Sequence, residues 1–265
     1  MKYLYIIMFL FLGIVSCEDV VEVDLDTATP RLVIDAALEL NEDGSTTSTV
    51  SLSRTAGFYE ENNPIVTNAS VVINESNGTT HNFRHIGGGV YESNTINLID
   101  NEVYTLIVED GSDIYTASQT LERTVPIATV EQLVLDNLDP EITRITVLYD
   151  DPVGLGDNYL FTYQDQYNDE LDVGDDEFTD GNRAPSIFFM EDLPVGTVIT
   201  LGIKGIDSDC YRFYETLLQQ TESGGPFDTQ PATVRGNIVN SVNEENFPFG
   251  YFRISEVFFT EYTVQ

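Results

Sequence analysis

The chain has no tryptophan, and only two histidines and two cysteines among its 265 residues. With Cys17 and Cys210 as the only thiols, no framework of several disulfides can hold the fold together, so a packed core must stabilise it. His81 and His85 lie four apart in a segment that reads as a strand, where that spacing corresponds to about 13 Å. They are therefore not expected to bind one metal ion directly.

Catalytic motifs are also missing from the sequence. It contains neither a G-x-S-x-G nucleophile elbow nor an H-E-x-x-H metal motif. We therefore expect a protein that is not an enzyme, with a hydrolase that uses paired carboxylates as the remaining enzymatic alternative.

Basic residues are scarce. Eleven lysines and arginines stand against 45 acids, which gives a formal net charge of −34 at pH 7. Such a chain should be repelled by nucleic acid and by anionic membrane surfaces, because both are bound mainly through lysine and arginine. Apolar residues make up 42% of the chain, too many for a disordered acidic tail. The composition predicts a folded protein with no nucleic-acid partner.

The chain has no apolar run of the roughly 20 residues that a membrane-spanning helix needs. Its longest run, Tyr3–Val15, follows a basic start and precedes Ser16. This arrangement is typical of an export signal. Residues 1–16 are therefore predicted to be a signal peptide.

The end of this segment reads Ile14-Val15-Ser16-Cys17, which resembles the lipobox of bacterial lipoproteins. The resemblance implies cleavage after Ser16 and attachment of acyl chains such as palmitate to Cys17, which would hold the protein to a membrane. An ordinary signal peptide followed by a chance cysteine is the alternative. Residues 17–30 read as an acidic tether. Its start, Glu18-Asp19, resembles a signal that sends lipoproteins of Bacteroidetes-type bacteria to the cell surface, which implies an outer-membrane protein facing the exterior.

From residue 31 the pattern is that of a β protein. Alternating strands are separated by turn residues, and the hairpin Tyr104–Val108, Asp110-Gly111, Ile114–Ala117 is the clearest example. About seven short strands at this spacing predict an immunoglobulin-like β-sandwich over 31–124.

A second β-rich domain with one short helix is predicted over 125–265. Asp207-Ser208-Asp209 can cap a helix at about 211–220, which Gly224 and Gly225 would end. Strands are expected on both sides of this helix, and Glu256–Gln265 is expected to close a sheet. The predicted fold class is thus mainly β, with an immunoglobulin-like β-sandwich followed by this second domain.

Acidic residues crowd the stretch from Asp165 to Asp180, which reads as a loop. Calcium takes six to eight oxygen ligands and often binds such loops, although the spacing of an EF-hand is absent. A solvated, mutually repelling loop is the alternative. The candidate calcium ligands are Asp172, Asp175, Asp176, Glu177 and Asp180. Tyr163, Tyr167, Phe178, Phe188 and Phe189 lie nearby, and we expect most of these aromatic residues in the core.

Several segments together resemble an uncharacterised domain-of-unknown-function family of lipoproteins from Bacteroidetes-type bacteria. They are Cys17–Asp24, Pro30–Asp35, Pro64–Ile73, Gly205–Tyr214, Arg235–Asn240 and Gly250–Phe252. Genes of this family often lie beside TonB-dependent receptors. The resemblance therefore implies a non-catalytic accessory or ligand-capture partner of a TonB-dependent transporter. A structural or adhesive surface protein is the alternative, since fold alone does not decide function.

Overall fold

The computed structural model describes residues 29–57, 60, 62–135, 141–221 and 233–265. The predicted signal peptide, Cys17 and the acidic tether up to residue 28 lie outside the described residues. Within the described part of the chain, no helix is both long enough and apolar enough to cross a membrane.

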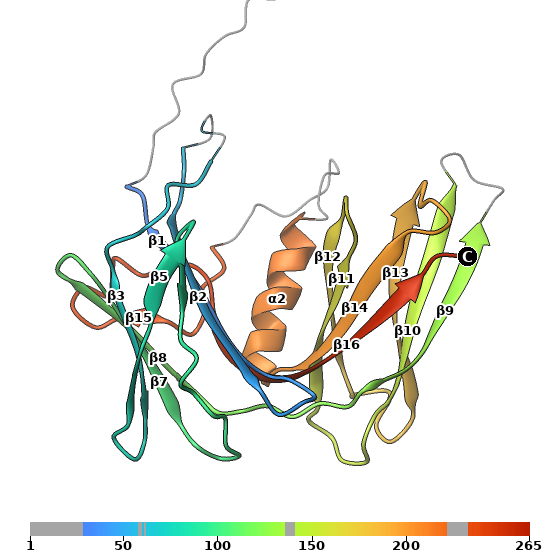
Figure 1. Cartoon of the computed structure of the whole chain (residues 1–265), viewed down its shortest axis with the longest axis horizontal. Coiled ribbons are helices and arrows are strands. Elements are labelled where there is room, and N and C mark those ends of the chain that lie inside the picture. The colour runs from blue at the N-terminus through green and yellow to red at the C-terminus, as the bar shows by residue number, and fades with distance from the viewer. Residues whose placement is uncertain (1–28, 58–59, 61, 136–140, 222–232) are drawn as a thin grey trace, which may run out of the picture.

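The N-terminal half forms a β-sandwich, drawn at the left of Figure 1. One layer is the run β1-β2-β6-β5 of an eight-stranded sheet, and the other is the five-stranded sheet β15-β8-β7-β3-β4. Alternate residues of β7 (Tyr104, Leu106 and Val108) are fully buried, as expected for a strand with one face on a core. The strands are β1 (Leu32–Leu40), β2 (Thr46–Arg54), β3 (Ser70–Glu75), β4 (Thr80–Asn82), β5 (Arg84–Gly87), β6 (Val90–Glu92), β7 (Tyr104–Asp110) and β8 (Asp113–Gln119).

The C-terminal half forms a second sandwich, at the right of Figure 1. Its layers are the three-stranded sheet β13-β10-β9 and the other end of the eight-stranded sheet, β12-β11-β14-β16. The elements are β9 (Ile127–Leu135), β10 (Ile142–Asp150), β11 (Asn158–Gln164), β12 (Asp169–Asp175), β13 (Arg183–Glu191), β14 (Val198–Gly205), α2 (Ser208–Thr221), β15 (Val239–Asn240) and β16 (Phe252–Thr263).

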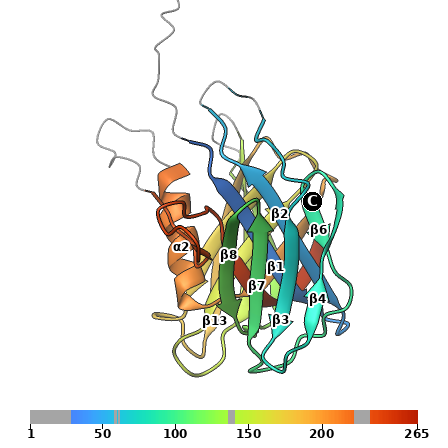
Figure 2. The same ribbon diagram turned by 90° about the vertical axis from the view of Figure 1, so that its left-hand side faces the viewer.

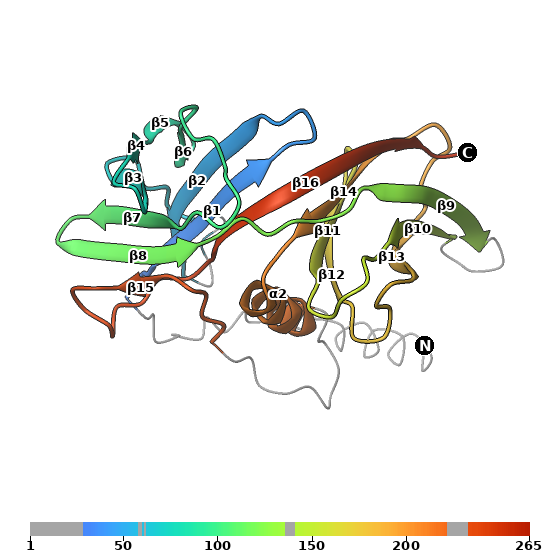
Figure 3. The same cartoon turned by 90° about the horizontal axis from the view of Figure 1, so that it is seen from below.

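Strand β16 belongs to both halves. Its first residues pair in parallel with β1, beginning at Ala36 and Phe252, and its later residues pair antiparallel with β14. Figure 3 shows β16 running from the first sandwich into the second. Short β15 also returns to the first sandwich, where it pairs with β8. The predicted segments 31–124 and 125–265 therefore share one continuous sheet.

Each sandwich has its own hydrophobic core, and a third cluster joins the helix to the shared sheet. The mainly β fold class predicted from the sequence is confirmed, with sandwich architecture and one helix among the described residues.

Helix α2 packs against the shared sheet between the two sandwiches (Figure 1), and Figure 2 shows it at one side of the strands. Its N-terminus is capped by Asp207, whose Oδ1 accepts hydrogen bonds from the backbone nitrogens of Asp209 and Cys210, both at 2.8 Å. Cys210, in the first turn of the helix, is fully buried, and burial raises the pKa of its thiol. A buried thiol with a raised pKa is a core residue rather than a reactive nucleophile.

A buried ionic cluster lies on the shared sheet. Glu39 of β1 accepts hydrogen bonds from Lys204 Nζ at 2.7 Å and from Arg253 Nη1 at 2.9 Å. Burial alone would raise the pKa of Glu39, but the two cations outweigh it and lower that pKa. Burial also lowers the pKa of Lys204, so its ammonium group bears a desolvation cost that Glu39 only partly offsets. The cluster links β1, β14 and β16.

Candidate functional site

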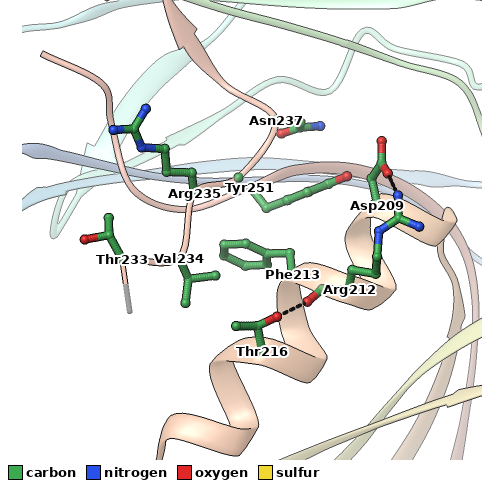
Figure 4. A pocket seen from close by; sticks show the side chains of 10 residues that line it. Asp209, Arg212, Phe213, Thr216, Thr233, Val234, Arg235, Asn237 and Tyr251 are labelled. Atoms are coloured by element: carbon green, nitrogen blue, oxygen red, sulfur yellow. Dashed lines mark hydrogen bonds and ion pairs between the residues drawn. The ribbon is translucent and has the colours of Figure 1, made fainter. Parts of the chain in front are cut away.

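An open pocket of about 400 Å³ lies between α2 and the segment 233–237 (Figure 4). Phe213 and Tyr251 form its aromatic wall, with ring centroids 5.1 Å apart. The remaining lining residues are polar or small, apart from Val234: Asp209, Arg212, Thr216, Thr233, Arg235, Gly236 and Asn237. Aromatic surface with a few polar groups is the usual lining of a small-molecule site.

Side-chain hydrogen bonds fix the walls of this pocket. Asn237 exchanges two bonds with the backbone of Phe252: its Nδ2 donates at 2.8 Å and its Oδ1 accepts at 2.9 Å. Tyr251 donates its hydroxyl to Asp207 at 3.2 Å, the same carboxylate that caps α2. Burial, followed by the charge of Asp207, raises the pKa of the Tyr251 hydroxyl. The helix and the segment 233–237 are thus both tied to the start of β16.

Arginines gather around the pocket although basic residues are scarce. The guanidinium of Arg212 is ion-paired with Asp209 on the helix. The guanidinium of Arg235 stacks 3.6 Å from the ring centroid of Phe247, and Arg31 stacks on the same ring at 3.9 Å. Arg235 also lines a second cavity of about 310 Å³ beside Phe247. These arginines give one region of an acidic protein the groups that bind carboxylate or phosphate.

A group of three carboxylates lies in the second sandwich. Oxygens of Asp151, Asp176 and Asp180 all lie within 4.8 Å of one another, and the first two residues are buried. Tyr159 donates its hydroxyl to Asp151 at 2.5 Å, and the backbone nitrogen of Gly156 donates to Asp176 at 2.7 Å. The carboxylate oxygens have more lone pairs than these hydrogen bonds use. The group could therefore hold a divalent cation such as calcium.

Asp157 lies beside this group. Burial, followed by repulsion from Asp151, Asp176 and Asp180, raises the pKa of its carboxyl group. The carboxyl of Asp157 thus adds to the negative charge gathered around Asp151, Asp176 and Asp180.

The structure does not bring the five candidate calcium ligands predicted from the sequence into one site. Asp176 and Asp180 come together with Asp151, which belongs to a second, weaker acidic turn in the sequence and was not among the candidate ligands. Asp172 instead accepts a hydrogen bond at 2.7 Å from the Oγ of Ser186, which lies in β13. This bond links β12 to β13. Asp175 and Glu177 lie outside the three-carboxylate group, and Glu177 is exposed.

The acidic stretch is not one loop, contrary to the sequence-based expectation. Asp169–Asp175 is the strand β12, which pairs antiparallel with all seven residues of β11. Its Leu171 and Val173 pack against the cluster beneath α2, and this burial stabilises the strand despite its acids. Because successive side chains of a strand point to opposite faces, the two candidate ligands in β12, Asp172 and Asp175, lie on opposite faces and cannot bind one ion together.

The expectation that most of the nearby aromatic residues are buried is wrong. Tyr163 and Phe188 lie in the core, but Tyr167, Phe178 and Phe189 are exposed. The alternating pattern of β13 places Phe188 inside and Phe189 outside.

The pocket beside α2 could not be recognised from the sequence. The helix and its cap were predicted, but Arg235 and Tyr251 reach the pocket only because β15 and β16 return to the first sandwich. The aromatic residues Phe213 and Tyr251 carry no signal that distinguishes a pocket wall from a core.

Solved structures show only distant similarity. A cytokine receptor complex is 14% identical, with 66% of this chain and 86% of that chain covered and a TM-score of 0.25. A segment of two fibronectin type III domains from chicken tenascin is 11% identical, covering 68% and 93%, with a TM-score of 0.21. A DUF4785 family protein from Legionella pneumophila is 14% identical, covering 69% and 53%, with a TM-score of 0.20. At these scores the similarities carry no information about function.

The family to which the chain belongs is better defined than its similarity to solved structures. No curated protein matches the chain at a significant level. The family described as "Domain of unknown function (DUF4249)" matches residues 18–260, which confirms the resemblance to a domain-of-unknown-function family at that level. The match extends over most of the chain, and the protein therefore belongs to the DUF4249 family.

Proposed function

We propose that the protein is an outer-membrane lipoprotein, anchored through Cys17 and facing the cell exterior, that captures a small ligand beside a TonB-dependent transporter. The pocket between α2 and the segment 233–237 is the observation that carries the ligand-capture part. Its described lining offers aromatic, amide and guanidinium groups and one carboxylate, that of Asp209, which is ion-paired with Arg212; neither a histidine nor a cysteine is among the lining residues. Such groups suit recognition rather than bond cleavage.

The sequence supports the anchor and the location. The short apolar segment, Ser16 and Cys17 match the requirements of a lipoprotein signal, and Glu18-Asp19 is consistent with export to the surface. A net charge of −34 means that an acyl anchor, and not the protein surface, would hold the protein to an anionic membrane. The transporter partner rests on the family resemblance.

Co-isolation from native membranes tests the proposal. Tagged full-length protein should co-isolate with a TonB-dependent transporter, and ligand uptake should fall in cells that carry Arg235→Ala with Phe213→Ala. Ile99→Ala, a change at an exposed site on the first sandwich, is the control. If no transporter is recovered and a deletion strain loses adhesion but keeps normal uptake, the spacer or adhesive alternative holds. The continuous sheet through both sandwiches favours that alternative.

Replacing Cys17 with alanine should remove the anchor. Wild-type protein is expected in the membrane fraction and to incorporate a fatty-acid analogue, whereas the Cys17→Ala variant should lose the label and leave the membrane after cell lysis. Cys210→Ala is the matched control, because the Cys210 thiol is buried. Wild-type protein that takes up no label would contradict lipidation.

We also propose that Asp151, Asp176 and Asp180 bind calcium. A ligand that binds only the folded state stabilises it by about 2.7 kcal/mol at a hundredfold excess over Kd, which corresponds to a rise in Tm of about 5–10 °C. Millimolar calcium chloride should therefore raise Tm more than sodium chloride of equal ionic strength does. Asp176→Asn should remove the difference, and Glu177→Gln, outside the group, should keep it. Equal effects of both salts on the wild type would exclude the site.

A further inference from the structure

Arg235 lies between the pocket beside α2 and a second cavity. The second cavity, of about 310 Å³, shares Arg235 and Gly236 with that pocket. Figure 4 shows the Arg235 side chain directed away from Phe213, and its guanidinium stacks on the ring of Phe247, which lines the second cavity. The two cavities are therefore neighbours, and Arg235 places its positive charge at the second one.

A second arginine fixes the ring on which Arg235 stacks. The guanidinium carbon of Arg31 lies 3.9 Å from the ring centroid of Phe247, and that of Arg235 lies 3.6 Å from it. Two guanidiniums this close to one centroid would overlap on a single face, so the ring lies between them. Nη1 of Arg31 donates to the backbone oxygens of Glu245 at 2.8 Å and of Phe247 at 3.1 Å. These contacts hold the ring in place, and Arg235 is oriented before any ligand binds.

The described part of the chain leaves the hydrogen-bond donors of Arg235 unused. A guanidinium donates in its own plane, so stacking on a ring does not occupy its N–H groups. Arg235 is exposed, and its N–H groups bind none of the described residues. Glu244 also lines the second cavity, but it forms no ion pair with Arg235 in the described structure. An arginine without an ion pair is not by itself a site, because the exposed Arg84 has no described ion pair either. What distinguishes Arg235 is its fixed orientation at a cavity.

The other charged side chains of the pocket beside α2 neutralise each other. The guanidinium of Arg212 is ion-paired with Asp209 on the helix. Thr216 is engaged as well, since its Oγ1 donates to the backbone oxygen of Arg212 at 2.7 Å. Among the described lining residues, Arg235 is therefore the cation whose donors remain for a ligand. Hydrogen bonds from a guanidinium are strongest to carboxylate and phosphate oxygens.

We propose that the captured ligand is anionic and that its carboxylate or phosphate binds the N–H groups of Arg235 beside Phe247. The rest of the ligand would lie against the aromatic wall of the neighbouring pocket, formed by Phe213 and Tyr251. The inference rests on the proposed ligand capture and names the chemical class of the ligand.

The net charge of the protein makes such a site specific. A chain of net charge −34 repels anions over most of its surface, so an anion is expected to bind only where cations are concentrated. Arg31 and Arg235, on the two faces of one ring, form such a place. Because the stacking already orients Arg235, little of its conformational freedom is lost when an anion binds.

An NMR titration of the purified full-length protein tests the charge of the ligand. The probes are hippurate, which carries a carboxylate, phenyl phosphate, which carries a phosphate, and hippuramide, the neutral counterpart of hippurate. At least one anion should bind saturably and shift the Nε–Hε signal of Arg235, which is the signal missing from the Arg235→Gln variant. Hippuramide should bind more weakly than that anion by about tenfold or more. The tighter of the two anions identifies the chemical source of the charge.

Two matched variants localise the bound anion. Arg235→Gln should weaken binding of the tighter anion by about tenfold or more, because it removes the guanidinium. Arg84→Gln makes the same change of charge at an exposed position of β5, and it should leave the affinity within about twofold because salt screens distant charges. Each of three outcomes would overturn the inference: neither anion binds, hippuramide binds as tightly as the tighter anion, or both variants weaken binding equally.

These outcomes can be told apart from a failure of the proposed function. If an anion binds at Arg235 but no transporter is recovered from membranes, the transporter partnership fails and the anionic class of the ligand holds. If a transporter is recovered and uptake depends on the pocket, but hippuramide binds as tightly as either anion, ligand capture holds and the anionic class is wrong.

Discussion

Glu39→Ala is expected to destabilise the fold by about 3–5 kcal/mol, because it leaves two buried cations without their carboxylate. Lys204 and Arg253 both bind Glu39 Oε1, and the side chains of all three residues are mostly buried. Chemical unfolding of purified protein measures the loss. Asp150→Ala, which breaks the exposed pair with Arg183, is the control and should leave the unfolding midpoint nearly unchanged.

The effect of Glu39→Ala should depend on pH. Since the pKa of Glu39 is lower in the folded state than in the unfolded state, its contribution is complete above the unfolded value. The contribution is lost as the pH falls through the folded value. The difference in unfolding free energy between the wild type and Glu39→Ala should therefore shrink in acid, and a difference that grows in acid would contradict the ion-pair explanation.

Gly250→Ala should destabilise the fold about as much as Glu39→Ala, because the added Cβ atom would overlap with β1. Gly250 has φ of +95°, and a Cβ atom there would lie 2.0 Å from the carbonyl oxygen of Ile34 in β1. The left-handed conformation costs about 1–2 kcal/mol for alanine, and the overlap adds about 1–3 kcal/mol or more. We expect a total loss of about 3 kcal/mol or more, measured by denaturant unfolding.

Gly44 provides the control for this substitution. Its φ of +80° carries the same conformational cost, but a Cβ atom there would meet nothing within 4 Å. Gly44→Ala should therefore cost only about 1–2 kcal/mol. Equal losses at both positions would show that the contact with Ile34 adds nothing to the conformational term.

Local features of the fold were predictable because their signals lie within a few residues. The hairpin expected around Asp110-Gly111 forms as β7 and β8, and the helix expected at about 211–220 forms as α2 with Asp207 as its cap. Turn chemistry and capping act through hydrogen bonds to neighbouring backbone groups, so the sequence reveals them directly.

Long-range pairings were not predictable in the same way. Strand β1 pairs with β16, which brings together residues more than 200 positions apart in the sequence. The residue pattern of a strand does not show which other strand it will pair with. The carboxylate group has the same origin, since Asp151 meets Asp176 and Asp180 only after two separate loops are brought together. Charge density alone indicated the whole stretch from Asp165 to Asp180, of which Asp176 and Asp180 join the group, whereas Asp172 and Asp175 lie on opposite faces of β12.

The position of β16 also determines when the protein can finish folding. The eight-stranded sheet is continuous only after Phe252–Thr263 has been inserted between β1 and β14, and this central strand follows the other seven strands of the sheet along the chain. Closing so long a loop makes this parallel pairing slow compared with the formation of local hairpins. The first sandwich therefore cannot be completed before Phe252–Thr263 has been synthesised. Until β16 has paired, the edges of β1 and β14 remain open to pairing with other chains, and this interval is when the protein is most exposed to aggregation.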